Sequence, residues 1–508
     1  MDAAIGIDVG SSSLKVSLVG ENGTLLATAE RSYTPACPRP GWKEIDPELW
    51  WNAARDAVRE LVHTIAGVRV RAMGVTGQMH TTVFVDEHGK SIRPAIMWND
   101  VRTASDVVAA RADFADMGLE GNARIVSSGS PALNLSWLRD EEPRSFERLS
   151  TFLIGPDWIV FRLTGTLGTD YCEASTSSLF DFEINGWSQS AIAWCGLTEG
   201  QLPPIRGAAQ VAGTLLPQVA DDLGLAHDVV VAAGTGDNPA AALPTGCITK
   251  GEPVLSLGTS CVLMFSRPAP DFDACGKNIV FSLDGDTRQT LVQGVVQSCG
   301  SSRTWWDLSI MRYSGHNASD DDIDPAHLGS NPVLFYPHLA GEKTIYADAS
   351  LRGAFIGLST DTKRGDFNLA LMEGVAFGVR ELVCRMGLQL DSAHGLQVIG
   401  GGSKSDVWMR VLANVLNVPV LRMEGAASAG YGAALLGLSA TGEVSLAEAC
   451  EHAVRVRDIF EPETKLVERY STSFKRYLRV HDALAYIDEK GPLTSTDELE
   501  VPSGTRAS

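Results

Sequence analysis

The chain has 508 residues, of which 44% are hydrophobic and 20% are charged. This length exceeds what one hydrophobic core usually supports, so we expect two or three domains of ordinary globular composition. The 42 basic and 62 acidic residues give a formal net charge of -20. Such a surface repels nucleic acid and anionic lipid, and we therefore exclude both as partners.

The N-terminal part of the chain predicts a mixed sheet with a helix packed on it. The segments 10–13 and 21–23 are typical hairpin turns between short β-prone stretches. Asp46 followed by Pro47 predicts the start of a helix, which Gly67 would end. Hairpin-joined strands, a helix and a further strand are typical of an α/β domain. The strands are expected at residues 3–9, 14–19, 24–31, 68–76 and 81–85.

The order of strand, glycine-containing turn and strand returns later in the chain. Residues 253–257 and 261–266 are β-prone and flank Gly258-Thr259-Ser260. A further buried strand is expected at 229–231, before a run of small residues. The repeated order predicts two related α/β domains, and the polar C-terminal residues predict a disordered tail. The domains are expected at residues 1–245 and 246–485, and the tail at 486–508.

The cysteine pattern and the lengths of the apolar runs predict the cellular location of the protein. The nine cysteines form no CxxC pair and are odd in number, which favours buried, reduced thiols over disulfides or zinc ligands. The chain begins Met1-Asp2 without the basic start of a signal peptide. No stretch approaches the ~20 apolar residues that span a membrane. We therefore expect a soluble, cytoplasmic protein.

The first predicted turn carries residue types that bind phosphate. Asp8 lies at the end of the first predicted strand. It is followed by Gly10, Ser11, Ser12 and Lys15. Backbone N–H groups and hydroxyls of such a turn can point at phosphate oxygens, an Asp can hold Mg²⁺, and a Lys can neutralise a phosphoryl group. The same residues also fit a plain hairpin turn.

A second turn of this kind, Gly258-Thr259-Ser260, follows the strand expected at 253–257. Alone, it also fits a plain tight turn. Taken together, the two turns predict a phosphate clamp, with one turn from each domain across an interdomain cleft. Neither turn matches the GxxxxGK[ST] pattern, which excludes a P-loop enzyme.

Two further polar or glycine-rich segments follow buried strands. Gly400-Gly401-Gly402 comes after the apolar run 396–399, and glycines there would let the backbone approach an adenine or a ribose. Asp237 lies in Gly236-Asp237-Asn238, where a carboxylate can accept the proton of an attacking hydroxyl. The glycines also fit a structural turn, and Asp237 also fits the cap of the following helix.

Polar and aromatic residues suited to a polyol follow two other predicted strands. One group is Gly77-Gln78-Met79-His80, and the other contains Trp98, Asn99, Asp100 and Arg102. Sugar hydroxyls can form hydrogen bonds with the polar groups, while the C–H face of a sugar packs on the indole of Trp98. A single His or Trp more often serves packing, but the cluster as a whole predicts a sugar pocket.

In their order along the chain, these segments closely resemble the FGGY carbohydrate kinases. The resemblance covers roughly residues 3–440, and seven segments in the right order are far more specific than any one of them. Within the family, the GQMH and WND segments are most similar to those of the xylulokinases. The segments are IGIDVGSSSLKV, VTGQMHTT, RPAIMWNDVR, GTGDN, LSLGTS, GAFIGL with LMEGVAFG, and VIGGGSKSDVW.

The resemblance implies two actin-like, ribonuclease-H-like ATPase domains around an interdomain cleft that closes on ATP, Mg²⁺ and a sugar. It implies that Asp237 deprotonates a sugar hydroxyl and that Asp8 organises Mg²⁺. It implies ATP-dependent phosphorylation of D-xylulose to D-xylulose 5-phosphate, and a homodimer. The implied sugar-binding residues are Met79, His80, Trp98, Asn99 and Asp237. The implied ATP-binding residues are Gly10, Ser11, Ser12, Lys15, Gly258, Thr259, Gly401 and Gly402.

Two positions depart from the family pattern. Asn134 stands where the family usually has Lys, and 155–158 reads Gly-Pro-Asp-Trp where many xylulokinases have Lys-Asp-Tyr. These departures leave a kinase for another sugar or polyol open, such as ribulose, ribitol or gluconate. A non-kinase actin-fold ATPase is a further alternative, but it would need no sugar pocket beside Asp237.

Overall fold

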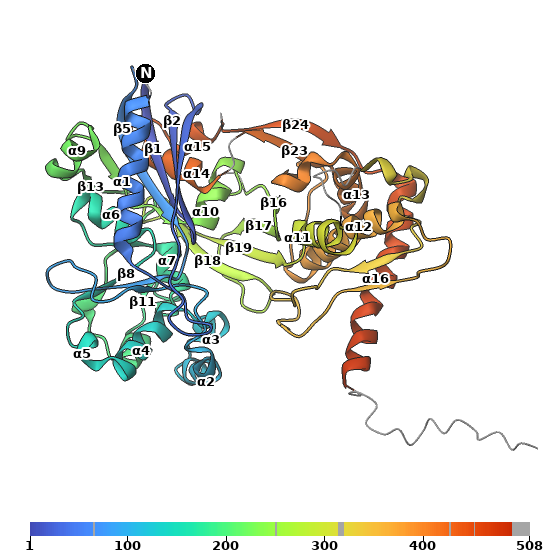
Figure 1. Cartoon of the computed structure of the whole chain (residues 1–508), viewed down its shortest axis with the longest axis horizontal. Coiled ribbons are helices and arrows are strands. Elements are labelled where there is room, and N and C mark those ends of the chain that lie inside the picture. Colours follow the sequence, from blue (N-terminus) through green and yellow to red (C-terminus); the bar gives the residue numbers. More distant parts are fainter. Residues whose placement is uncertain (65–66, 249–250, 313–319, 426–427, 452, 490–508) are drawn as a thin grey trace, which may run out of the picture.

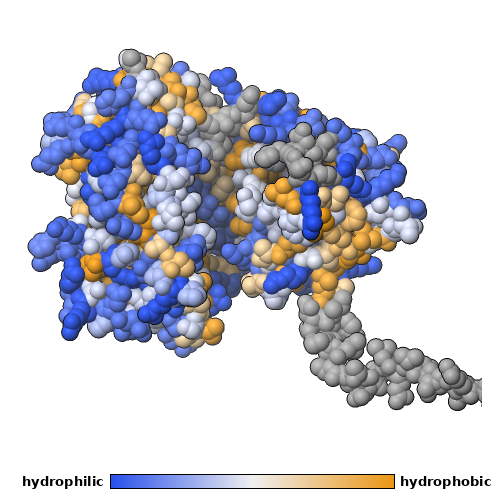
Figure 2. Space-filling model, viewed as in Figure 1, coloured by the Kyte–Doolittle hydropathy of each residue, from blue (hydrophilic) through white to orange (hydrophobic). Residues whose placement is uncertain are grey.

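The computed structural model describes residues 1–64, 67–248, 251–312, 320–425, 428–451 and 453–489. The chain forms two lobes with a deep hollow between them, visible in the space-filling view (Figure 1, Figure 2). Each lobe is built on a seven-stranded sheet. Across the described ranges, no helix combines the length and the apolar character that a membrane span requires.

The first lobe has a mixed sheet. Its strands are β1 (Asp2–Val9), β2 (Ser13–Gly20), β3 (Leu25–Ser32), β5 (Arg69–Gly77), β13 (Val211–Thr214), β14 (Val230–Ala232) and β15 (Thr235–Gly236). β1 and β2 form the predicted antiparallel hairpin, whereas β1, β14 and β15 all run parallel to β5. The carboxyl ends of these parallel strands therefore meet at one edge of the sheet, which is where ligands bind in open α/β sheets.

One face of this sheet is covered by α1 (Pro47–Thr64), as the sequence predicts. The Asp46 carboxylate accepts the Glu48 N–H at 3.0 Å and so starts the helix. The apolar side of α1 faces the sheet and includes the fully buried Trp50. Two shorter helices on this side of the lobe also pack against α1: α6 (Asp157–Thr164) and α9 (Pro217–Leu223).

A smaller helical region extends from the first lobe, below its sheet in Figure 1. It contains a four-stranded sheet in the order β4-β7-β6-β8. Its strands are β4 (Glu44–Ile45), β6 (Thr82–Val85), β7 (Ala95–Ile96) and β8 (Thr151–Ile154). Its helices are α2 (Val107–Asp116), α3 (Glu120–Ile125), α4 (Pro131–Glu141), α5 (Pro143–Phe146) and α8 (Gln189–Cys195). The other short elements of this lobe are β9 (Thr169–Asp170), α7 (Tyr171–Thr176), β10 (Phe180–Asp181), β11 (Gly186–Trp187) and β12 (Ile205–Arg206).

The second lobe repeats the plan of a mixed sheet with helices packed against it. The sheet order is β18-β19-β17-β16-β22-β23-β24, and α12, α13 and α16 pack against one another beside it. Its strands are β16 (Val254–Leu257), β17 (Cys261–Arg267), β18 (Lys277–Ser282), β19 (Arg288–Val296), β22 (Leu396–Ile399), β23 (Val420–Gly425) and β24 (Val454–Phe460). The other elements are α11 (Gly300–Thr304), β20 (Leu334–Tyr336), β21 (Ala354–Ile356), α12 (Arg364–Arg385), α13 (Asp406–Leu416), α15 (Leu446–Glu451) and α16 (Thr464–Glu489).

The two lobes are joined by α14 (Ala429–Ala440), which lies between β23 and β24 of the second sheet in sequence but packs on β1 and β5 of the first. A Cβ atom at Gly6 would lie 1.8 Å from the Gly430 carbonyl oxygen, and one at Gly74 would lie 1.9 Å from that of Ala433. Only glycine permits this approach of helix to sheet. α14 also packs on α10 (Asp237–Ala242). The helix that connects the lobes therefore also supports the segment that begins with Asp237.

The predicted boundaries of the two domains and of the tail stay predictions. The last described helix, α16, ends at Glu489. Residues 490–508, which make up most of the predicted tail, lie outside the described residues.

Candidate active site

Asp237 lies at the carboxyl end of the first sheet, where β15 gives way to α10. β15 pairs with β5 so that Thr235 lies opposite Thr76. Gly236 is the cap residue of α10 and Asp237 is its first helical residue. The carboxylate is half-buried. Burial raises the pKa of Asp237 to about 6, although the Asn238 N–H and the nearby Lys277 ammonium act in the opposite direction.

Asp8 reaches the same edge from the neighbouring strand, since β1 pairs with β5 at Asp8 and Thr76. Its carboxylate is also half-buried. Burial, and after it the negative charge of Asp237, raise the pKa of Asp8 to about 7, while Lys15 lowers it. The structure thus brings the two predicted carboxylates close enough to repel each other.

The predicted phosphate turn of the first lobe is tight and well supported. The Gly10 N–H donates to the Ser13 carbonyl at 3.0 Å, and the Gln78 side chain donates to the Gly10 carbonyl at 3.1 Å. Lys15 lies opposite Asp8 in the β1–β2 pairing. Its side chain is 59% exposed, and its ammonium lies 4.0 Å from a Glu30 carboxylate oxygen. Lys15 therefore lies at the rim of the turn.

The GQMH segment lies beside Asp237. His80 adopts a left-handed backbone conformation with φ 68°, which a non-glycine residue rarely adopts and which is common at functional sites. Its Nε2 lies 2.7 Å from the Nζ of Lys277. Met79 is buried, and its sulfur accepts a hydrogen bond from the side chain of Asn238 at 3.5 Å. Two predicted sugar-binding residues thus contact the neighbourhood of the predicted base.

Trp98 connects the predicted sugar group with the phosphate turn. Its indole is 42% exposed, and its Nε1 donates to the Ser11 hydroxyl at 2.9 Å. Its backbone N–H donates to the Thr81 hydroxyl at 3.2 Å. Asn99, the next residue, is exposed. An exposed aromatic face beside polar groups can pack on the C–H face of a sugar.

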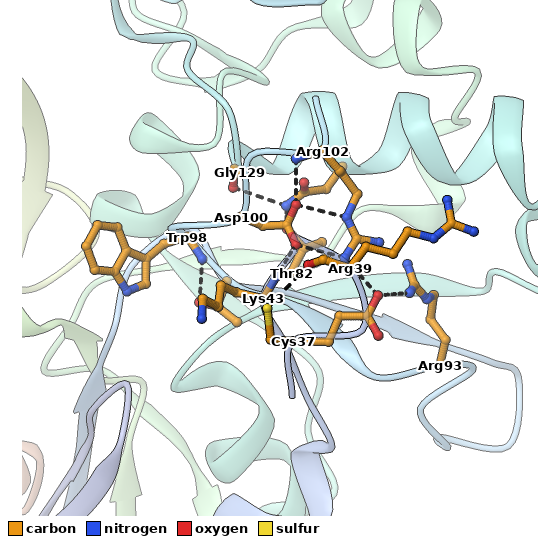
Figure 3. Close-up of polar contacts among 12 residues, drawn as sticks. Cys37, Arg39, Lys43, Thr82, Arg93, Trp98, Asp100, Arg102 and Gly129 are labelled. Atoms are coloured by element: carbon orange, nitrogen blue, oxygen red, sulfur yellow. Dashed lines mark hydrogen bonds and ion pairs between the residues drawn. The ribbon is translucent and has the colours of Figure 1, made fainter. Parts of the chain in front are cut away.

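A buried ionic cluster holds the loop that carries Trp98 (Figure 3). The Arg102 guanidinium donates to both oxygens of Asp100, at 2.9 and 2.8 Å, and to Glu44 at 2.7 Å. Asp100 also accepts the Lys43 N–H at 2.6 Å. In Figure 3, Trp98 points away from these ion pairs. The cluster therefore fixes the loop without contacting the indole, and the exposed face of the ring stays open to a ligand.

Two tryptophans enclose the Arg102 guanidinium. Its carbon lies 3.9 Å from the ring centroid of Trp42 and 4.5 Å from that of Trp137. The side chain of Arg102 is only 1% exposed. Cation–π contacts of this kind are strongest when the cation is removed from water.

The glycine turns of the second lobe contact each other. The Gly258 carbonyl accepts the Gly300 N–H at 3.0 Å. Gly400 has φ 92°, and a Cβ there would lie 2.7 Å from the Leu257 carbonyl. A Cβ at Gly402 would lie 2.9 Å from the Leu257 side chain. Four predicted ATP-binding residues thus lie in adjoining turns at the ends of β16 and β22: Gly258, Thr259, Gly401 and Gly402.

Two buried or partly buried charged residues near Asp237 are absent from the sequence prediction. Lys277 reaches His80 from β18 of the other lobe. Glu173 on α7 is fully buried, and burial raises its pKa well above the usual range, as do the neighbouring carboxylates. Neither residue belongs to a recognisable motif, and each approaches the site through contacts distant in sequence. No local pattern could have identified them.

The two positions that depart from the family pattern contact the loops that carry the predicted sugar-binding residues. Asn134 is fully buried and donates to the Thr82 hydroxyl at 2.9 Å and to the Gly129 carbonyl at 3.1 Å. A Cβ at Gly155 would in its present conformation lie 2.3 Å from the Gln78 carbonyl oxygen. Both positions therefore support the loops that carry His80 and Trp98.

We expect the ligand-free protein to lose stability as pH rises from about 4 to about 7. The pKa values of Asp237 and Asp8 rise from 3.8 to about 6 and about 7 on folding. Each group therefore contributes stability that is complete below 3.8 and is lost as pH passes its folded pKa. Asp8→Asn should raise the free energy of unfolding at about pH 8 by ~1–2 kcal/mol, less than the full shift implies because solvent reaches the side chain.

Urea denaturation at about pH 5 and about pH 8 measures this effect. Asp228→Asn is the matched control, because the Asp228 side chain is 67% exposed, and it should change stability little at either pH. An Asp8→Asn variant with the same free-energy difference from wild type at both pH values would contradict the expectation.

Family models and solved structures both match this chain over most of its length. Residues 3–244 match the N-terminal domain of the FGGY family of carbohydrate kinases, and residues 254–441 match its C-terminal domain. A crystal structure of a protein described as a "xyloylose kinase" from Brucella ovis is 31% identical, with a TM-score of 0.87 over 95% of this chain and 99% of that one. The predicted class of two actin-like domains around a cleft is therefore confirmed.

Two relatives that align with most of this chain are 30% and 31% identical to it. The xylulose kinase of Bacillus subtilis strain 168 is 30% identical over 95% of this chain and 97% of its own. The xylulose kinase of Escherichia coli K12 is 31% identical over 87% of this chain and 91% of its own. The chain is an ATP-dependent sugar kinase and belongs to the FGGY family of carbohydrate kinases.

Proposed function

We propose that the chain transfers the γ-phosphoryl group of ATP to the 5-hydroxyl of D-xylulose, giving ADP and D-xylulose 5-phosphate. The observation that carries the proposal is the position of Asp237, whose half-buried carboxylate directly follows β15 and lies near Lys277, the hydrogen-bond partner of His80. The relatives that match almost the whole chain are named xylulose kinases. Their shared name supports the choice of sugar.

Asp237 acts as the general base. It accepts the proton of the sugar hydroxyl as the hydroxyl oxygen attacks the γ-phosphorus, and the bond from that phosphorus to the bridging oxygen of ADP breaks. A pKa of about 6 leaves the carboxylate mostly ionised near neutral pH while raising its affinity for a proton. A base is most effective when its pKa lies close to the working pH.

The turns at the strand ends bind the nucleotide. The turn at Gly10, Ser11 and Ser12 presents the N–H and hydroxyl groups of its two serines to the phosphates, and Lys15 lies at the rim to neutralise their charge. The second-lobe turns at Gly258-Thr259 and Gly401-Gly402 complete the nucleotide site. Glycine at these positions lets the backbone approach the ligand closely.

Asp8 would hold Mg²⁺, and the residues present fit this ion. Among the described residues, no group of three or more His, Cys, Asp or Glu side chains could hold a metal ion by itself. Mg²⁺ commonly needs no such group, because it binds one or two carboxylates together with phosphate oxygens and water. When bound, the ion neutralises charge on the β- and γ-phosphates.

The sugar subsite positions the acceptor. Met79, His80, Trp98 and Asn99 surround the hydroxyl-bearing substrate, and the cleft between the lobes excludes water from the reaction. Alignment of the hydroxyl with the γ-phosphorus supplies much of the rate, since aligned reactants are worth ~7–11 kcal/mol. A cytoplasmic location and a homodimeric state stay predictions.

A coupled assay of ADP release tests the proposal. The panel comprises D-xylulose, ribulose, ribitol, gluconate and a reaction without sugar. D-Xylulose should give the highest kcat/KM, and ATP turnover without sugar should be far slower, because a closed site protects ATP from water. Turnover of another sugar but not of xylulose would reject the proposed substrate. ATP turnover that no sugar changes would instead favour an ATPase without kinase activity.

A further inference from the structure

A lysine from the second lobe lies within the proposed sugar subsite of the first. Lys277 is the first residue of β18, the edge strand of the second sheet. Its Nζ lies 2.7 Å from Nε2 of His80. All the sugar-binding residues predicted from the sequence belong to the first lobe. With Lys277, the subsite would contain residues from both lobes.

β18 is hydrogen-bonded to the first lobe, and these hydrogen bonds fix the position of Lys277. The Val280 N–H donates to the Ser175 hydroxyl on α7 at 3.0 Å. The Ala208 N–H, from the first lobe, donates to the Ser282 carbonyl at 2.8 Å. These bonds lie along the same strand that begins with Lys277. The lysine therefore reaches His80 from a fixed strand and needs no closure of the lobes to do so.

The Lys277 ammonium has hydrogen-bonding capacity left over. Across the described ranges its one hydrogen-bond partner is His80, and no carboxylate oxygen lies within ion-pair distance. A protonated lysine has three N–H donors, so two remain. Burial lowers the pKa of Lys277, while the nearby Cys172, Glu173 and Asp237 act in the opposite direction and favour the charged form. A charged donor with unused capacity beside the base is suited to an oxygen of a ligand.

The contact with Lys277 also decides what His80 can offer a sugar. An ammonium has only donors, so Nε2 of His80 is the acceptor in this bond and the ring proton lies on Nδ1. Nδ1 is itself buried, toward the Thr176 backbone. Neither ring nitrogen therefore carries a proton pointed at the cleft. The N–H donor beside Asp237 comes from Lys277.

We propose that Lys277 is a sugar-binding residue: its ammonium, anchored on His80 Nε2, donates a hydrogen bond to an oxygen of the acceptor sugar next to the hydroxyl that Asp237 deprotonates. This inference rests on the proposed function and deepens it. The ligand atom is a hydroxyl or carbonyl oxygen of a neutral sugar. His80 is then a positioning residue, which holds the ammonium in the subsite.

Steady-state kinetics of Lys277→Met test the inference. The methionine is an unbranched side chain one atom shorter than lysine, and it removes the charge and the donors. A lost hydrogen bond from a charged group should raise the KM for xylulose by ~10–100-fold, with the KM for ATP nearly unchanged. Lys277→Arg should recover part of the loss, because it restores a charged donor. A purely structural role would raise both KM values and would not be relieved by arginine.

Arg288→Met is the matched control. Arg288 lies on β19 of the second lobe and, like Lys277, contacts the first lobe. It donates to the Tyr171 hydroxyl on α7 at 3.1 Å. Its loss should leave the KM for xylulose at the wild-type value. A Lys277→Met variant with a wild-type KM for xylulose would overturn the inference, as would equal increases in the two KM values.

A binding measurement separates this inference from the proposed function. The melting temperature of each variant is recorded with every sugar of the panel, in the absence of ATP, since a bound ligand stabilises the native state. Whichever sugar stabilises wild type should fail to stabilise Lys277→Met at the same concentration. If that sugar is not xylulose, the proposed substrate is wrong and the role of Lys277 stands. If it stabilises both proteins equally, or if no sugar stabilises wild type, the role of Lys277 is rejected.

Discussion

Replacing Asp237 with Asn should lower kcat by ~10²–10⁴-fold, the usual loss when a general base is removed. Asparagine keeps the shape of the side chain but cannot accept the hydroxyl proton. The affinity for ATP should change little, because the proposed nucleotide contacts come from other residues. Stopped assays of sugar phosphate formation measure the loss, and fluorescence titration with a nucleotide analogue measures the retained binding.

Asp228→Asn is again the control for this experiment. It makes the same chemical change at an exposed position paired with Arg69, the first residue of β5, at the opposite end of that strand from Gly77, and it should keep wild-type kcat. Near-normal turnover by Asp237→Asn would remove the carboxylate from the mechanism. A loss of ATP affinity as large as the loss of kcat would instead give Asp237 a role in nucleotide binding.

The second large effect concerns stability. Arg102→Met should lower the free energy of unfolding by ~3–5 kcal/mol, because it leaves buried negative charge without a partner. Asp100 is fully buried, and it and Glu44 both receive hydrogen bonds from Arg102. The loss of packing between Trp42 and Trp137 adds to the effect. Denaturant unfolding gives the magnitude.

Two further variants distinguish the cost of an unpaired buried charge from the cost of removing any arginine side chain. Arg148→Met removes a 58% exposed partner of Asp86, and it should cost less than ~1 kcal/mol because the Asp86 carboxylate keeps the His88 and Lys90 N–H groups as donors. Adding Asp100→Asn to Arg102→Met should recover part of the stability, since it removes one uncompensated charge. A loss in Arg102→Met no larger than in Arg148→Met would contradict the role assigned to the cluster.

Much of the framework around the site could be predicted from the sequence because its determinants are local. The hairpin of β1 and β2 is specified by alternating apolar residues around a Gly/Ser turn, and α1 by Asp46-Pro47 and its apolar face. The position of Asp237 at a strand end likewise follows from the buried strand before it. Such signals depend on neighbours within a few residues, and a single sequence contains them.

The rest of the site depends on contacts between distant parts of the chain. Lys277 meets His80 across 197 positions, and Arg102 meets Glu44 across 58. The packing of α14 on β1 joins residues more than four hundred positions apart, at Gly6 and Gly430. No periodicity or turn signal encodes such pairs, since they arise only when the two sheets and the helices between them have been assembled. A sequence pattern therefore predicts Asp237 as the base, whereas no pattern predicts Lys277 beside it.

The most direct test of the account is a crystal structure of the protein with bound D-xylulose and a non-hydrolysable ATP analogue. The account predicts the 5-hydroxyl oxygen within hydrogen-bond distance of the Asp237 carboxylate, ~2.6–3.2 Å, with the γ-phosphate analogue on the far side of that oxygen. A sugar bound away from Asp237, or a residue 237 side chain turned from both ligands, would contradict it.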